Sequence, residues 1–270
     1  MKREPSSRND VIFDHIVRFY IDTAEPVGSR TISRRLDIGL SSASIRNVMA
    51  DLEELGFLKQ PHTSAGRVPT DLGYRHWVDS LMEPEELNEK EKSLIQSELN
   101  KARTIEGLSE KICKVLSEIT GNTVVIYIKN LKRVSFLNYL LEELVETQKL
   151  NDFFEEEPEL FIDGASRMFE QPEFQDLSKM RTLLQAFDEK TDFLHALLRD
   201  MKDERVYVRI GHENEYGELE DLSLVTKDCY MNHASIGGVA VVGPTRMDYP
   251  KVVSVVDYVA DSVSERMSRL

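Results

Sequence analysis

Long apolar runs and closely spaced cysteines are both missing from this chain of 270 residues. No window approaches the roughly 18 consecutive apolar residues that a membrane-spanning helix needs. The N-terminus, MKREPSSRNDVIFDH, has no apolar segment typical of a secretory signal peptide. Cys113 and Cys229 lie far apart without CxxC spacing, which favours reduced packing residues. We therefore expect a globular protein of the cytoplasm, neither secreted nor inserted in a membrane.

Motifs of enzymes and of metal or phosphate sites are missing as well. The glycine-rich run 237–244 lacks the Lys-Ser/Thr ending of a phosphate-binding loop and predicts a strand that leaves through a Gly-Pro turn. Arg246 could bind an anion after that turn, but a structural ion pair is favoured. Histidines without metal-ligand spacing are His62, His76, His195, His212 and His233. We expect no enzymatic activity, no metal and no cofactor.

Positive charge is scarce and unevenly placed. The net charge is −14, yet residues 1–80 hold 11 Lys or Arg and 11 Asp or Glu, so the excess of acid lies in residues 81–270. An acidic surface cannot lie along a phosphate backbone, whereas a neutral, Arg-rich part can if its cations share one face. The sequence indicates a binding head on an acidic body with another task.

The head begins with two helices and a turn. Apolar residues at helical spacing predict a first helix over 7–23, which Glu25-Pro26 ends. Ser29 is expected to cap a short second helix that runs to Leu36, with Arg30 on its outer side. The sequence DIG at 37–39 predicts the turn that leads to a third helix.

The third helix, from Ser41 or Ser42 to Leu55, has two distinct faces. One arc is apolar and consists of Ile45, Val48, Met49, Leu52 and Leu55. The other arc carries Ala43, Arg46 and Asn47. A small residue lets a helix approach base edges, arginine can grip guanine or a phosphate, and asparagine can pair with adenine. Ser42 and Ser44 place hydroxyls at the positive end of the helix, where a phosphate fits. Taken alone, this pattern also suits a solvent-facing helix of an ordinary three-helix bundle.

A short hairpin after the third helix favours DNA binding. Residues 57–60 predict one strand, 62–66 a turn and 67–69 the returning strand, with Gly66 at a positive φ. Thr70 is expected to cap the next helix. The order of helix, turn, helix and hairpin predicts a winged helix-turn-helix domain that reads duplex DNA. The candidate DNA-binding residues are Ser29, Arg30, Ser42, Ala43, Ser44, Arg46, Asn47, His62, Thr63 and Arg67.

The body has the pattern of an α+β domain. An apolar stripe from Ile95 to Ile119 predicts a long helical region with a possible break at Gly107; it can pack on its own domain, which is favoured, or on a second copy. Strands are expected at Thr123–Ile128, Val206–Ile210, Leu222–Thr226 and Val239–Val242. Helices are expected around Pro158–Phe169, Leu177–Met201 and Val252–Leu270. Strands and helices of this size predict one antiparallel sheet with helices.

The expected domains are therefore a DNA-binding head over 1–82, a helical linker over 83–121 and a regulatory or dimerisation domain over 122–270.

Several long motifs make a family resemblance visible. They are EPVGSRTIS, LSSASIRNVMADLEELGFLKQPHTSAGRVPTDLGYR, GASRMFEQPEF, IGHEN followed by LSLVT, and GPTRMDY. With them the chain resembles the HrcA family of heat-inducible transcription repressors over nearly all of its length. The resemblance implies a winged-helix repressor of chaperone operons that binds an inverted-repeat operator as a homodimer. It also implies a GAF-like body and modulation by the GroE chaperonin.

The chain departs from the family pattern in its centre. The segment from Leu131 to Leu137 resembles the start of the usual central region, but Leu150–Glu157 already leads into GASRM. The dimerisation insertion that the family carries there is thus shortened or absent. The dimer contact is left to two candidates, the Ile95–Ile119 stripe and the Val252–Leu270 helix.

Two functions from different classes fit these observations. The first is a repressor that occupies an operator. The second is a small-molecule-sensing GAF-type regulator whose winged helix binds a protein partner. DNA binding through several phosphates weakens steeply with salt, whereas the protein-binding alternative need not.

Overall fold

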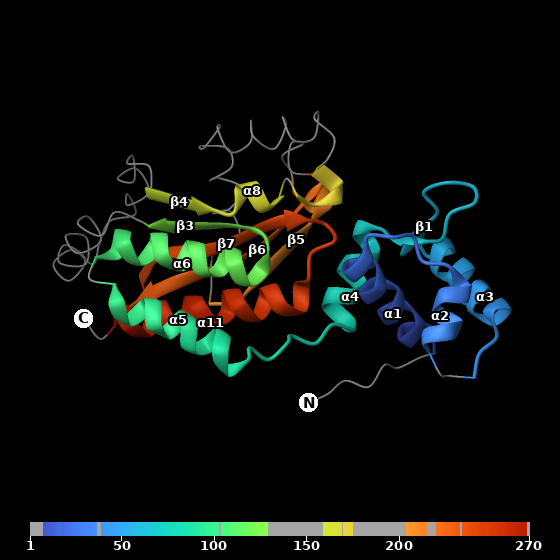
Figure 1. Cartoon of the computed structure of the whole chain (residues 1–270), viewed down its shortest axis with the longest axis horizontal. Helices are drawn as coiled ribbons and strands as arrows, with labels where there is room; N and C mark the ends of the chain where they lie inside the picture. Colours follow the sequence, from blue (N-terminus) through green and yellow to red (C-terminus); the bar gives the residue numbers. More distant parts are fainter. Residues whose placement is uncertain are drawn as a thin grey trace, which may run out of the picture. The chain divides into compact units, whose positions relative to one another are not determined.

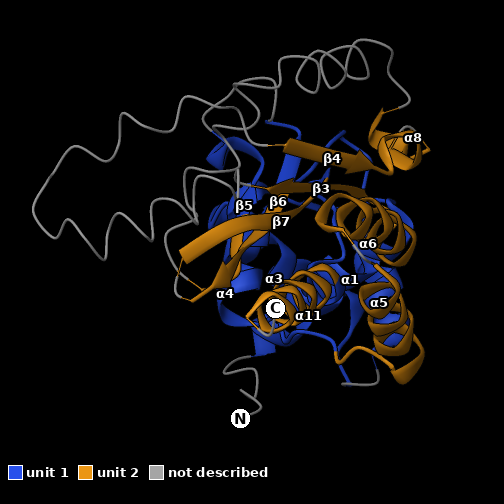
Figure 2. Cartoon of the chain, turned by 90° about the vertical axis from the view of Figure 1, so that its left-hand side faces the viewer, with its two compact units in different colours: residues 1–85, 209–223, 243–251 blue, residues 86–208, 224–242, 252–270 orange. Residues whose placement is uncertain are grey.

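A computed structural model describes residues 8–36, 39–102, 104–128, 159–168, 170–174, 204–214, 220–232 and 234–268 (Figure 1). The chain divides into two compact units, and each is assembled from separate stretches of sequence (Figure 2). Unit 1 comprises Met1–Glu85, Arg209–Ser223 and Gly243–Lys251, and unit 2 comprises Glu86–Val208, Leu224–Val242 and Val252–Leu270. The fold is α+β, as the sequence predicts. Within the described ranges, no helix combines the length and the apolar character needed to cross a membrane.

Unit 1 contains four helices near the positions that the sequence predicts. They are α1 (Arg8–Thr23), α2 (Ser29–Arg35), α3 (Ser42–Glu54) and α4 (Asp71–Ser80). Ser41 caps α3, because its Oγ accepts the Ser44 amide at 3.1 Å. Thr70 caps α4 in the same way, with its Oγ1 3.0 Å from the Gly73 nitrogen. The predicted cap at Ser29 is wrong: the N-cap of α2 is Gly28, which makes no side-chain cap bond.

The helices of unit 1 close around one apolar core. The buried apolar side chains that the four helices supply are Ile12, Phe13, Ile16, Val17, Ile32, Ile45, Met49, Leu52, Tyr74 and Trp77. Three residues of the predicted apolar arc of α3, Ile45, Met49 and Leu52, are buried in this core, and Val48 is half-buried. Leu55 is wrong as a core residue because 59% of it is exposed, at the end of the helix.

A two-stranded hairpin follows α3. The strands β1 (Leu58–Lys59) and β2 (Val68–Pro69) pair antiparallel. The predicted positive φ at Gly66 is wrong, since the backbone there is not left-handed. This glycine is required by a close approach instead: a Cβ would lie 2.4 Å from the carbonyl carbon and oxygen of Val27.

Two motifs from late in the sequence pack onto α1 and α4 within unit 1. In the IGHEN segment, which forms the short 3-10 helix η3 (Gly211–Glu213), Glu213 receives two bonds from Arg75 of 2.8 and 2.6 Å. In the GPTRMDY segment, Arg246 donates to the Ile21 carbonyl in the last turn of α1 at 2.5 Å. The Tyr249 ring lies 5.8 Å from the ring of Tyr74. These contacts give both motifs a structural role.

Five strands form the main sheet in the order β4-β3-β7-β6-β5. They are β3 (Thr123–Ile128), β4 (Glu159–Asp163), β5 (Tyr207–Ile210), β6 (Leu222–Met231) and β7 (Ala234–Pro244). The pairings of β3 with β4 and with β7 are antiparallel. The helix predicted around 158–169 is wrong in its first half, where β4 lies; only the short α8 (Ala165–Met168) is helical, followed by the 3-10 helix η2 (Pro172–Phe174). The helix expected over 177–201 and the central segments 131–137 and 150–157 lie outside the described residues.

Three helices lie on one face of the sheet, α5 (Glu89–Lys101), α6 (Ile105–Thr120) and α11 (Tyr249–Met267) (Figures 1 and 2). The break in the predicted long helix falls before α6 and not at Gly107, because Thr104 caps α6 by accepting the Gly107 amide at 3.1 Å. The apolar stripe is buried within the chain at Ile95, Leu99, Leu108, Ile112, Val115 and Leu116. The apolar face of α11 is likewise buried at Val252, Val256, Val259 and Met267.

The glycine pair in β7 makes room for a tyrosine. Tyr127 on β3 stands opposite Gly238 in the ladder, and its hydroxyl donates to Asp228 on β6. A Cβ on Gly238 would lie 2.5 Å from that hydroxyl oxygen. The run that resembles a phosphate loop is therefore a strand shaped around a buried tyrosine.

Candidate nucleic-acid interface

The N-terminal half of α3 presents the groups that the sequence assigns to base reading. Ala43, Ser44, Arg46 and Asn47 are exposed, whereas Ile45 between them is fully buried. Within the described part of the chain, no hydrogen bond or ion pair occupies the side chains of Arg46 and Asn47. Both have their full hydrogen-bonding capacity available to a partner.

The N-termini of α2 and α3 are held together by two serines. The hydroxyls of Ser29 and Ser42 are 3.0 Å apart, and Ser29 is only 9% exposed. Arg30, the next residue, is exposed. The structure thus brings Ser29, Arg30 and Ser42 to the same end of α3, but the Ser29 hydroxyl faces its neighbour. Ser44 is also engaged, since its Oγ lies 3.0 Å from that of Ser41.

The hairpin tip projects His62 and Thr63, which are both exposed. Gln60 holds the tip in shape, because its Nε2 donates to the carbonyls of Thr63 and Ala65 at 3.0 Å each. The sequence identified the two exposed tip residues but gave no sign of the role of Gln60. Its side chain reaches across the turn, which no local pattern reveals.

Arg67, at the base of the hairpin, has a partner inside unit 1. Its Nε and Nη2 lie 2.9 and 2.8 Å from the Glu53 carboxylate at the end of α3. Its backbone also exchanges two hydrogen bonds with Val27, of 2.8 and 2.9 Å. Arg67 is therefore held through both its side chain and its backbone.

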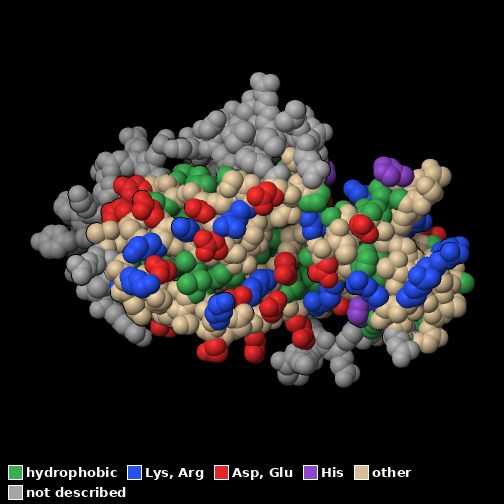
Figure 3. Space-filling view, viewed as in Figure 1, with side chains coloured by type: hydrophobic (Ala, Val, Ile, Leu, Met, Phe, Trp, Pro, Cys, Tyr) green, Lys and Arg blue, Asp and Glu red, His purple; other side chains and the backbone are tan. Residues whose placement is uncertain are grey.

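Charge is distributed unequally over these helices. Arg30, Arg34 and Arg35 are exposed on α2, and the Arg35 guanidinium lies 4.5 Å from the Phe19 ring centre. In Figure 3 Lys and Arg side chains gather over the part of the surface formed by α2 and α3. Asp51 and Glu54 occupy the other half of α3. A polyanion would therefore meet α3 at its N-terminal half.

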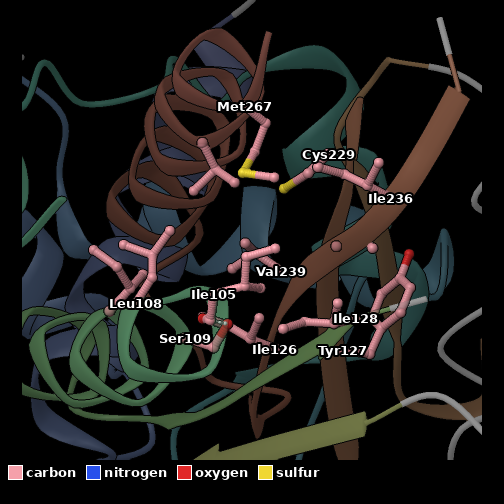
Figure 4. A pocket seen from close by; sticks show the side chains of 14 residues that line it. Ile105, Leu108, Ser109, Ile126, Tyr127, Ile128, Cys229, Ile236, Val239 and Met267 are labelled. Carbon is pink, nitrogen blue, oxygen red and sulfur yellow. Dashed lines mark hydrogen bonds between the residues drawn. The ribbon is translucent and has the colours of Figure 1, made fainter. Parts of the chain in front are cut away.

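In unit 2 a small apolar cavity of about 40 Å³ lies between the sheet, α6 and α11. Figure 4 shows Leu108, Ile126 and Met267 converging on it from α6, β3 and α11. Small-molecule sites usually measure about 300–1,000 Å³, so this cavity cannot enclose a metabolite. Burial raises the pKa of the lining Cys229 to about 12, which keeps the thiol protonated and unreactive.

A polar cleft of about 570 Å³ in the same unit is lined by four acids, Glu204, Asp228, Asp261 and Glu265, together with serine, asparagine, tyrosine and one lysine. Its one lysine, Lys227, is already held by Asp257 and Asp261 at 2.7 and 2.5 Å. Among the described residues, no group of three His, Cys, Asp or Glu side chains could hold a metal ion.

Comparison with known proteins decides the family. The family model described as "HrcA protein C terminal domain" matches residues 127–253. The heat-inducible transcription repressor HrcA of Symbiobacterium thermophilum is 34% identical over 337 aligned positions, which cover 97% of this chain and 98% of that protein. The chain belongs to the HrcA family. The HrcA protein of Acetivibrio thermocellus is 33% identical over 339 positions, with 97% and 96% covered.

Two further findings bear on the fold of this HrcA protein. The alignments are longer than its 270 residues, so several tens of positions of its relatives have no counterpart in the chain. A crystal structure of a hypothetical protein at 2.2 Å resolution superposes with a TM-score of 0.72 and 22% identity, covering 98% of this chain and 99% of that chain. At that identity the likeness concerns the fold alone. The relatives in this family are named heat-inducible transcription repressors.

Proposed function

We propose that this HrcA protein represses transcription by binding double-stranded DNA through a winged helix-turn-helix head, residues 1–82. In this proposal α3 enters the major groove, and the β1–β2 hairpin is the wing. The observation that carries the proposal is the exposed half of α3, where Arg46 and Asn47 have no partner among the described residues. A helix that served only to close the bundle would not need two such groups next to an arginine-rich α2.

The candidate residues take separate roles. Arg46 forks onto guanine or a phosphate and Asn47 pairs with adenine, while Ala43 allows close approach. Arg30, Ser42 and Ser44 lie at the positive end of α3, where backbone phosphates are expected. Contact with the DNA backbone or minor groove falls to the wing residues His62, Thr63 and Arg67. Ser29 supports this surface from beneath through Ser42.

The test is a measurement of affinity and specificity on duplex DNA. Preferred sequences are first selected from random DNA with the wild-type protein. Arg46→Ala and Asn47→Ala should then each cost about 1–3 kcal/mol on the selected site and relax the preference at one base pair per half-site. Lys90→Ala is the matched control, because it removes one exposed positive charge from α5 without touching the head.

The salt dependence separates this proposal from a protein-binding winged helix. Binding through several phosphates must weaken steeply between low and physiological salt. If Asn47→Ala leaves the ratio of selected to scrambled DNA unchanged, α3 is not the reading helix. If the wild type binds no duplex DNA at low salt, the head has another partner.

A homodimer on an inverted repeat follows from the size of one head. A single small module covers too little DNA for tight specific binding, so twofold pairing on a palindrome is expected. The apolar faces of α5, α6 and α11 are buried within one chain and are not free for that pairing. The contact therefore lies elsewhere in the domains that we propose over 83–121 and 122–270. Sedimentation that shows one monomer per operator at micromolar concentration would remove the dimer.

We further propose that the GAF-like body is the heat-sensitive part and that the GroE chaperonin restores it, in the cytoplasm. Strands such as β3 and β7 are apolar and β-prone, so they would aggregate once the body opens. Repression would then weaken when chaperonin is occupied by other unfolded chains. The test is to warm the purified protein, cool it, and measure DNA binding with and without chaperonin and ATP. Full recovery without chaperonin would remove this mechanism and leave the repressor proposal intact.

A further inference from the structure

The hairpin base at Arg67 joins three parts of unit 1. Its side chain bonds to Glu53 at the end of α3. Its main chain pairs in both directions with Val27, immediately before α2. Gly66 lets the two backbones approach, because a Cβ there would collide with Val27. One residue thus links the hairpin to the end of α3 and to the segment that precedes α2.

The Glu53 contact uses the charge of Arg67. Two of its guanidinium nitrogens, Nε and Nη2, lie within hydrogen-bonding distance of the same carboxylate oxygen of Glu53, Oε2. The Arg67 side chain is 22% exposed and that of Glu53 is 35% exposed. A phosphate placed on Arg67 would either displace this carboxylate or lie close to it, and two negative groups repel each other. Arg46, by contrast, is exposed and has no carboxylate partner among the residues that the structure describes.

We propose that Arg67 and Glu53 are positioning residues that set the angle between the wing and α3, and so decide which base pairs and phosphates the two can touch together. This inference rests on the proposed DNA-binding function and assigns Arg67 a different role from a direct phosphate grip. A planar guanidinium with two bonds fixes direction as well as distance. Specificity then depends on a pair that itself touches no base.

Replacement of Glu53 gives results of opposite sign for the two roles. If Arg67 grips a phosphate, Glu53→Gln removes a competing negative charge and DNA affinity rises. If the pair positions the wing, Glu53→Gln lowers affinity for the selected site by roughly two- to fivefold, the range of a partly exposed ion pair, and lowers the ratio of selected to scrambled DNA. Glu54→Gln is the matched control, because it removes one negative charge from the next position of α3, where the side chain is exposed.

A second variant separates charge from geometry. Arg67→Lys retains the positive charge but loses the forked pair of donors. A positioning role predicts the same loss of specificity as Glu53→Gln, with the salt dependence unchanged. Wild-type specificity in Arg67→Lys, or a reduced salt slope in Arg67→Gln with specificity intact, would overturn the proposal.

A measurement without DNA keeps the inference distinct from the proposed function. The amides of Val27 and Arg67 are each bonded to the other residue's carbonyl, so their hydrogen exchange reports on the hairpin base. Exchange should accelerate at both amides in Glu53→Gln and stay unchanged in Glu54→Gln. Unchanged exchange in Glu53→Gln overturns the positioning role. Accelerated exchange in a protein that binds no duplex DNA overturns the proposed function and leaves the structural linkage in place.

Discussion

Gly66→Ala should destabilise unit 1 although it adds only one methyl group. The new Cβ would lie 2.4 Å from both the carbonyl carbon and oxygen of Val27 and 2.7 Å from the Pro26 carbonyl carbon. All three atoms are backbone, so no side-chain rotation can relieve the clash. The hairpin base must move away from the segment before α2.

The magnitude follows from the bonds that this movement breaks. Val27 and Arg67 exchange two backbone hydrogen bonds, of 2.8 and 2.9 Å. Each is worth about 0.5–1.5 kcal/mol net, so their loss lowers the free energy of unfolding by about 1–3 kcal/mol. The Arg67 bonds to Glu53 would also be disturbed, which adds to the loss.

Urea unfolding of Gly66→Ala, with Ser64→Ala as control, measures this difference. Ser64 is exposed in the same turn, so its replacement should change the free energy of unfolding by less than about 0.5 kcal/mol. Hydrogen exchange at the Val27 and Arg67 amides should accelerate in the glycine variant alone. A stability equal to the wild type, with those amides still protected, would refute the close-approach argument.

Further predictions concern the body and the late motifs. Tyr127→Phe removes the hydroxyl that donates to Asp228, a residue only 2% exposed, and should lower the free energy of unfolding in urea by about 1–3 kcal/mol. Tyr258→Phe is the control: it removes only a part-buried hydrogen bond with Gln96 and should lower the free energy of unfolding by less. Equal losses in the two variants would contradict the argument. The hydrogen bond and charge of Asp71 raise the pKa of His212 above its usual value of about 6.5. The contribution of this pair to stability is therefore complete below that usual value and is lost as pH rises through the raised pKa. Because His212 is 76% exposed, the difference between wild type and His212→Gln in urea unfolding against pH should be small, and a larger difference at high pH than at low pH would reverse the expected sign.

Local sequence signals predicted the elements whose causes are local. The start of α3 at Ser42, the cap at Thr70 and the buried stripe of α3 follow from side chains within one or two turns of each other. Strand β3 was likewise predicted at its observed bounds, because six consecutive β-prone residues form it. The exposed residues Arg46 and Asn47 could be placed by helical spacing alone.

Contacts between distant residues explain the errors. The sequence predicts a helix where β4 forms. This prediction fails because β4 is held by its ladder with β3, whose residues lie far away in the chain. The sequence predicts a turn in which Gly66 has a positive φ, whereas the close approach of the Val27 backbone is what requires glycine there. The bond between Arg67 and Glu53 likewise joins residues 14 positions apart, and only the structure shows it. No periodic pattern could reveal these partners.

The bridge between Val27 and Arg67 also limits how the proposed DNA-binding head can be divided. Val27 comes before α2 and α3 and Arg67 comes after them, so the bridge closes a loop around both helices. A peptide that contains only α2 and α3 would lack this closure, the buried face of α1 and the Trp77 side chain of α4. Segments of that length are marginal helices in water without tertiary packing. The pair should therefore fold only together with the flanking residues, as one cooperative unit, and any transplant into another protein must carry the chain from α1 through α4.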